Sequence, residues 1–289
     1  MNPRPPECKS LAPPFAEISL NHDDFKVWLE KRYVKKYASS IQYYIKKYIH
    51  LYNGRLSEID SFSRAKRRMA LSSLIALSKY LGQYNNFKQR IGNFGLKWSG
   101  RSNYDSFRRI WNNDAADIPD WLEKCYARFD FTYATFIKFC AISGLRKSEA
   151  INSFNLVLEL KKQNRISDYH NAKLEALEHY KFPELFLRKS KNAYLSFIPK
   201  EFLSEIFNCH RVSNVILKRR FHKHKMKCRL QHLRHYCATN LIQNGLLREE
   251  ADLLQGRIGR SVFMQHYFSP NIEQLRIRTI KIVRQMIPN

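Results

Sequence analysis

The chain has 289 residues, 44% of them hydrophobic, and this length and composition suit one large folded domain or two ordinary ones and exclude a disordered protein. It carries 51 lysines and arginines against 25 acidic residues, and the formal net charge of +26 favours a polyanionic partner such as nucleic acid. No apolar run is long enough to span a bilayer and no signal-peptide pattern is present, which argues against a membrane protein. The six cysteines are scattered without CxxC pairs, as is typical of reduced thiols, so we expect a cytoplasmic protein.

The N-terminal part of the chain predicts a flexible leader followed by a small helical domain. Residues 1–20 are rich in proline, and apolar residues then recur at helical spacing through residues 21–98. The opposite faces of these helices carry clustered lysines and arginines, which are typical either of a solvated surface or of contacts to DNA phosphates. Because acidic residues are sparse, we expect DNA contacts from Lys35, Lys36, Lys46, Lys47, Arg67 and Arg68.

A polar stretch at residues 99–118 is the predicted linker to a second domain at residues 119–289. Periodic apolar residues predict that this second domain is mostly helical. Between Phe182 and Pro199 we expect two short strands about a polar turn. The tail at residues 272–289 is predicted to be helical, and we expect its apolar side to dock on a neighbouring protomer.

The strongest basic patch lies between Ile206 and Arg248, where ten lysines and arginines occur without one acidic residue. Its densest part supplies the second set of predicted DNA contacts, Lys218, Arg219, Arg220, Lys223 and Lys225. The histidines from His222 to His232 superficially resemble a zinc pattern, but the lysines between them would repel a dication and the spacing fits no standard site. We therefore expect no metal centre.

Residues 231–267 predict two helices joined by a short turn, with a glycine placed to end each helix. This stretch carries Arg234, Arg257 and Tyr267. An arginine offers a planar fork of donors that matches phosphate oxygens, and a tyrosine can attack phosphorus and hold it covalently. Arginines and a tyrosine without a carboxylate cluster nearby favour phosphoryl transfer without a metal, although a basic helical surface that only contacts DNA fits the same spacing.

Several stretches, taken in chain order, resemble the sequence boxes of the tyrosine recombinases, the phage-integrase family. A-I-S-G-L-R-K-S-E resembles the first box, which implies that Arg146 is the first catalytic arginine and that Glu149 supports it. Q-H-L-R-H-Y-C-A-T resembles the second box, which implies that Arg234 is the second arginine. The family also has a lysine on a β-hairpin between these boxes, and Lys191 before F-I-P fits that interval.

The sequence departs from the usual family pattern at two histidine positions. In this it resembles the archaeal and archaeal-virus integrases, where the same two positions also vary. Gln231 stands where the second box usually has histidine, so proton transfer falls to Lys191 or to a neighbour such as His232. Arg257 stands where the next motif usually has histidine, and it keeps a donor for phosphate. Tyr267 then follows at the interval of the family's nucleophile.

The resemblance implies a mainly α fold, with a helical N-terminal core-binding domain and a mixed α+β catalytic domain that holds a small β-hairpin or sheet. It implies a site-specific recombinase that cuts and rejoins a double-stranded DNA attachment site through a 3′-phosphotyrosine intermediate, as a tetramer on DNA and without a cofactor. Two alternatives stay open: a type IB topoisomerase-like enzyme that relaxes DNA, and a non-catalytic DNA-binding protein of the same fold. In each case the expected location is the cytoplasm of a host cell, in association with DNA.

Overall fold

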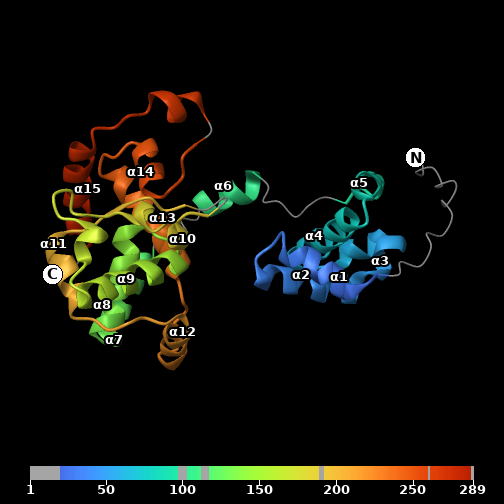
Figure 1. Cartoon of the computed structure of the whole chain (residues 1–289), viewed down its shortest axis with the longest axis horizontal. Coiled ribbons are helices and arrows are strands. Elements are labelled where there is room, and N and C mark those ends of the chain that lie inside the picture. The colour runs from blue at the N-terminus through green and yellow to red at the C-terminus, as the bar shows by residue number, and fades with distance from the viewer. Residues whose placement is uncertain (1–19, 97–102, 112–116, 189–191, 260, 288–289) are drawn as a thin grey trace. The chain divides into compact units, whose positions relative to one another are not determined.

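The computed structural model describes residues 20–96, 103–111, 117–188, 192–259 and 261–287. The chain forms two compact units, residues 1–111 and residues 112–289 (Figure 1). Most of each unit is helical and the described strands form one small antiparallel sheet, which confirms the predicted fold class. Within the described part of the chain, no helix is both long and apolar enough to cross a membrane.

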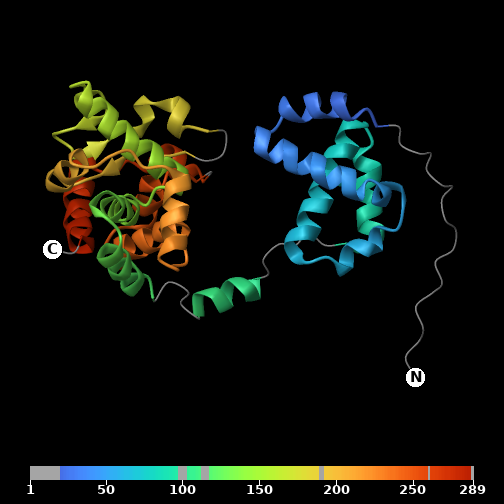
Figure 2. The same cartoon turned by 90° about the horizontal axis from the view of Figure 1, so that it is seen from below.

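Unit 1 is a set of helices around an apolar core, blue to green in Figure 2. α2 lies along α4, and α2 buries one face because apolar residues such as Ile41 and Ile45 recur one turn apart. The elements are α1 (His22–Glu30), α2 (Lys35–Tyr48), α3 (His50–Asn53), η1 (Leu56–Ser61), α4 (Arg64–Tyr80), α5 (Tyr84–Asn93) and α6 (Asn103–Trp111). Helix α6 lies inside the stretch predicted as a linker.

Unit 2 holds a second apolar core. Its longer helices are α7 (Ile118–Arg128), α8 (Phe131–Ser143), α9 (Lys147–Lys162), α11 (Lys200–Phe207), α12 (Asn214–Lys223), α13 (Leu230–Gln243), α14 (Arg248–Leu254) and α15 (Ile272–Met286). Its shorter elements are η2 (Ile166–Asp168), β1 (His170–Asn171), β2 (Ala176–Leu177), η3 (His179–Lys181), α10 (Pro183–Phe186), β3 (Ser196–Phe197) and η4 (Phe263–Tyr267).

α8 is the central helix of unit 2. Beyond its first turn its apolar residues are buried on all sides, and α7, α9, α11, α13 and α15 pack against it. A helix that is apolar around its whole circumference has to be enclosed in this way. α8 ends at Ser143 because Gly144 adopts a left-handed conformation with a φ of 61°. Arg146 follows two residues later as the N-cap of α9, so its backbone is held by the end of the buried helix α8.

The sheet differs from the predicted hairpin. β2 pairs antiparallel with both neighbours, so that Ala176 lies opposite Asn171 of β1 and opposite Phe197 of β3. The prediction of two strands between residues 182 and 199 is wrong in its first half, where Pro183–Phe186 forms α10. Proline has no N–H to donate and its φ suits the first position of a helix, so Pro183 begins a helix rather than a strand.

The C-terminal helix α15 packs on its own unit. Leu275, Ile282 and Met286 on its apolar side are buried in the core of unit 2. On its flank, Arg278 donates to the carboxylate of Glu250 in α14 at 3.0 Å. The predicted docking of this apolar side on a neighbouring protomer is therefore wrong, because the same residues are covered within the chain itself.

We expect Leu275→Ala to lower the free energy of unfolding by about 2–5 kcal/mol, because this leucine is fully buried and its truncation leaves a cavity. The matched control on the same helix is Ile277→Ala, since Ile277 is 47% exposed and should change stability by about 0.5 kcal/mol or less. Urea unfolding followed by circular dichroism measures both variants. An effect of Leu275→Ala as small as that of the control would mean that α15 does not dock on its own unit.

Candidate active site

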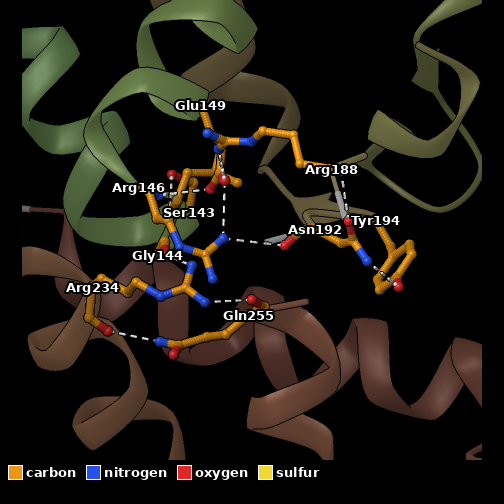
Figure 3. A network of polar contacts seen from close by, with 10 residues as sticks. Ser143, Gly144, Arg146, Glu149, Arg188, Asn192, Tyr194, Arg234 and Gln255 are labelled. Carbon is orange, nitrogen blue, oxygen red and sulfur yellow. Dashed lines mark hydrogen bonds and ion pairs between the residues drawn. The ribbon is translucent and has the colours of Figure 1, made fainter. Parts of the chain in front are cut away.

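Arg146 lies at the start of α9, where Glu149 fixes both its backbone and its side chain. The Oε2 atom of Glu149 accepts the backbone N–H of Arg146 at 3.0 Å, and its Oε1 atom accepts Nη1 of the guanidinium at 2.9 Å. Nη1 also donates to the backbone carbonyl of Asn192 at 3.3 Å. In the described part of the chain these side-chain hydrogen bonds all use Nη1, so Nε and Nη2 stay free to meet a ligand (Figure 3).

Arg234 is a buried arginine on α13, with 9% of its surface exposed. Its Nη1 donates to the carbonyl of Gly144 at 2.9 Å, and its Nη2 donates to the carbonyl of Gln255. The side-chain amide of Gln255 returns a hydrogen bond to the carbonyl of Arg234 at 2.7 Å. These contacts hold the guanidinium in one orientation beside that of Arg146, as Figure 3 shows.

The arginines share one electrostatic environment. The pKa of Arg234 is lowered to about 10, first by burial and then by the positive charges of Arg146 and Arg257. Glu149 acts in the opposite direction. Arg234 is therefore still protonated at neutral pH, and three cations lie near one another in a partly buried site. An arriving phosphate would relieve their mutual repulsion, because it brings negative charge.

Two glycines allow the segments of this site to approach closely. A Cβ on Gly144 would lie 3.0 Å from Sγ of Cys237, and a Cβ on Gly256, whose φ is 65°, would lie 2.0 Å from the carbonyl oxygen of Asn192. The Cys237 thiol donates to the carbonyl of Ile142 at 3.4 Å, and burial raises its pKa to about 12. Gly144 thus lets the end of α8 lie against α13, and Gly256 lets the end of α14 lie against the backbone of Asn192.

Arg257 follows Gly256 at the end of α14 and faces solvent. Its side chain is 57% exposed, and Nη1 lies 3.5 Å from a carboxylate oxygen of Asp252. An exposed ion pair of this kind contributes roughly 0–1 kcal/mol. A phosphate can therefore replace Asp252 as the partner of Arg257 at little cost.

Tyr267 is exposed and has no partner within the arginine site. It ends η4, a π-helical turn between α14 and α15 in which no residue is buried. The tyrosine is 73% exposed, and its side chain makes no hydrogen bond among the described residues. Figure 1 shows this turn at the top of unit 2, on the loop that leaves α14 and returns to α15. The structure thus brings Arg146, Arg234 and Arg257 together and leaves Tyr267 in solvent.

The predicted proton donors are placed less completely. Lys191 lies outside the described residues. Gln231 and His232 lie in the first turn of α13, where Nε2 of one is 3.3 Å from Nε2 of the other. Gln231 is exposed and His232 is half-buried. The roles of Lys191 and His232 in proton transfer, and the supporting role of Gln231, stay predictions.

Most of the predicted DNA-contact residues lie on the surface. The exposed ones are Lys35, Lys36, Lys46, Lys47, Arg68, Lys218, Arg219, Lys223 and Lys225. Arg67 and Arg220 are half-buried and form ion pairs with Asp60 and Asp130. Arg220 also lies over the ring of Tyr133, with its guanidinium carbon 4.2 Å from the ring centroid. These two arginines therefore have partners inside their own units, and their contacts with DNA stay predictions.

Sequence reasoning missed Arg188, Asn192 and Gln255. Nη2 of Arg188 donates to Oε1 of Glu149 at 2.6 Å, and its backbone N–H donates to Oδ1 of Asn192 at 2.8 Å. Arg188 and Asn192 stand on either side of Lys191 in the sequence, and Gln255 precedes Gly256 in L-Q-G-R. Nearness to these motifs was the available signal, but it does not reveal a contact made across the fold.

The family comparison covers the region that holds these residues. The family model described as archaeal phage integrase matches residues 113–274, which is more than half of the chain and most of unit 2. The matched range includes the three clustered arginines and Tyr267. A comparison with curated proteins found no match. Since the family match extends over more than half of the sequence, the chain belongs to the archaeal phage integrase family.

Proposed function

We propose that this chain is a site-specific DNA recombinase that cuts and rejoins double-stranded DNA through a 3′-phosphotyrosine intermediate. The observation that carries the proposal is the pairing of the Arg146 and Arg234 guanidinium groups, with Arg257 two residues after the Gln255 carbonyl that binds Arg234. One of them is buried and fixed by two backbone carbonyls, which is the preorganisation that a transition state with developing negative charge requires. Family membership points to DNA as the substrate.

In the proposed reaction, the phenolic oxygen of Tyr267 gives up its proton to solvent and attacks the scissile phosphorus. An O–P bond to tyrosine forms, the bond from phosphorus to the 5′-oxygen breaks, and Lys191 protonates that oxygen as general acid. The arginines stabilise the extra negative charge of the pentacoordinate state. The 5′-hydroxyl of a partner duplex then gives its proton to the neutral Lys191 and attacks the phosphotyrosine, and the O–P bond to Tyr267 breaks and the phenolate takes up a proton from solvent. The number of phosphodiester bonds is unchanged, so no nucleotide cofactor is consumed.

Exposure of Tyr267 implies that it must move before it can attack. Among the described residues from Gly256 to Asn271 none is buried, so this segment can be repositioned without breaking the core. We propose that assembly on DNA places Tyr267 against the arginines of its own or a neighbouring protomer. Two duplexes with two cleavage positions each require four protomers, which corresponds to a tetramer on DNA.

The proposed reaction is tested by trapping the intermediate. The purified chain is incubated with duplexes that carry a randomised segment and a nick, because loss of the short cleaved strand prevents religation. Complexes that survive denaturing detergent are recovered and sequenced, and the duplex most enriched, here named the selected duplex, becomes the substrate for later tests. An adduct mapped to Tyr267, followed by strand exchange between two labelled duplexes, supports a recombinase. Relaxation of supercoiled DNA without exchange favours the topoisomerase-like alternative, and DNA binding without an adduct favours the non-catalytic one.

We expect binding of the selected duplex to depend steeply on salt and to need no magnesium. Lysine and arginine contacts to phosphates release counterions, so affinity should fall on the order of 10³-fold or more between about 50 and 200 mM salt. Fluorescence anisotropy with a chelator present measures this. Replacing Lys46 or Lys47 with glutamine should reduce the slope of log affinity against log salt concentration by about 1 for each residue. The control is Lys173→Gln on unit 2, which should leave this slope unchanged. Affinity that hardly changes over this range would contradict the proposed phosphate contacts.

A further inference from the structure

Glu149 is a buried carboxylate that two arginines from different parts of the chain share. Its side chain is 1% exposed, and its Oε1 atom accepts Nη1 of Arg146 at 2.9 Å and Nη2 of Arg188 at 2.6 Å. Figure 3 shows Arg188 reaching across from its loop to this oxygen, on the side of Glu149 away from Arg234. A buried anion is tolerated only when it is paired and hydrogen-bonded, and Glu149 meets this condition through both arginines.

Because Glu149 pairs with both Arg146 and Arg188, these three side chains together determine the net charge that this part of the site presents to a phosphodiester. If Arg146 were the only partner of Glu149, the carboxylate would cancel the charge of the arginine that it orients. With Arg188 as a second partner, two guanidinium charges stand against one carboxylate charge and leave an excess of one positive charge. Charges in a partly buried site interact more strongly than in bulk water, so this excess acts on a phosphate held by Arg146.

Arg188 is held in place from its backbone as well as from its side chain. Its N–H donates to Oδ1 of Asn192 at 2.8 Å, and the carbonyl of the same asparagine accepts Nη1 of Arg146 at 3.3 Å. Asn192 thus joins the backbone of Arg188 to the side chain of Arg146. The Arg188 side chain is 46% exposed, so it contributes little to the core and its contact with Glu149 is its main interaction.

We propose that Arg188 is a positioning residue for strand cleavage, which pairs with Glu149 and so preserves the positive charge of Arg146 for the scissile phosphate. The proposal rests on the proposed phosphoryl transfer at the arginine site. Glu149 then orients Arg146 through two hydrogen bonds, while Arg188 offsets the negative charge that this orientation introduces. Arg146 keeps Nε and Nη2 for the phosphate oxygens.

The test is a double-mutant cycle on the rate of covalent adduct formation with the selected duplex at saturating protein. We expect Arg188→Ala to slow adduct formation by about 10–100-fold, which is the usual range for a residue that supports a directly contacting one. Adding Glu149→Gln to that variant should restore the rate by at least about 5-fold, because a neutral glutamine no longer offsets the charge of Arg146. Arg188→Lys should keep most of the wild-type rate because lysine carries the same charge.

A purely structural role for Arg188 gives a different pattern. If Arg188 only holds its loop against Glu149, the double variant is as slow as Arg188→Ala or slower, and this result would overturn the proposal. A wild-type rate for Arg188→Ala would overturn it as well. Arg188→Gln, which keeps more of the side-chain length, takes the place of the alanine variant if circular dichroism shows that the latter is unfolded.

The same experiment separates this proposal from the proposed function. If the wild-type chain forms no adduct with any selected duplex, the proposed recombinase activity fails. If the wild-type chain forms the adduct and Glu149→Gln gives no rescue, the role of Arg188 alone fails. Anisotropy with the selected duplex measures affinity for each variant, so that slower adduct formation is not confused with weaker binding.

Discussion

Replacing Tyr267 with phenylalanine is expected to abolish the covalent protein–DNA adduct while leaving affinity for DNA within about 2-fold of wild type. Phenylalanine keeps the ring but has no oxygen to attack phosphorus, so the first chemical step cannot occur. The tyrosine is 73% exposed and its hydroxyl makes no hydrogen bond among the described residues, so its loss should change the free energy of unfolding by roughly 0.5 kcal/mol or less. Denaturing gels detect the adduct, and anisotropy measures binding.

The matched control for this variant is Tyr104→Phe, because Tyr104 is 67% exposed and lies in unit 1. It should form the adduct at the wild-type rate. Mass spectrometry of the trapped wild-type complex identifies the modified residue independently of the variants. An adduct that persists in Tyr267→Phe, or that maps to Tyr236 or another tyrosine, would show that the nucleophile is misassigned.

The second large effect is expected from Arg234→Ala, which should slow adduct formation by on the order of 10²–10³-fold while DNA binding changes little. Arg234 is one positive charge among 51 lysines and arginines for binding, but it is the buried and fixed member of the arginine site for catalysis. Single-turnover rates at saturating protein separate the two quantities.

Arg248→Ala is the matched control for Arg234→Ala. Arg248 lies on α14, its side chain is 83% exposed, and its nearest carboxylate oxygen, on Asp252, is 3.9 Å away. Because Arg234 also bonds the carbonyls of Gly144 and Gln255, thermal unfolding of both variants must accompany the kinetics. Equal losses of binding and of cleavage in Arg234→Ala would contradict its assignment to the transition state.

The helices and the three arginines were predictable because the signals that define them are local. Apolar residues at helical spacing mark the helices, and glycines at residues 144, 245 and 256 end three of them with positive φ. Arg146 and Arg234 stand at fixed places relative to such glycines and to the family boxes. Their convergence followed from the resemblance, and the structure places both beside Gly144.

The contacts that complete the site were not predictable because they join residues distant in sequence. Arg188 reaches Glu149 across the fold, and Gln255 bonds Arg234 through a backbone carbonyl that carries no sequence signal. The spacing of apolar residues in α15 predicted that one side of this helix is buried. The spacing does not indicate whether that side packs on its own unit or on another protomer. Pro183 began a helix within a stretch whose apolar residues fit a strand equally well.

The reactivity of the Cys237 thiol can be used to measure local opening of the arginine site. It lies against Gly144, whose carbonyl holds Arg234, and burial raises the pKa of the thiol to about 12. Alkylating reagents attack the thiolate and need access to it, so Cys237 reacts only when α13 separates from the end of α8. The alkylation rate of Cys237 therefore measures how often the arginine site opens. A lower rate in the presence of phosphate would measure how much the bound anion stabilises the closed site.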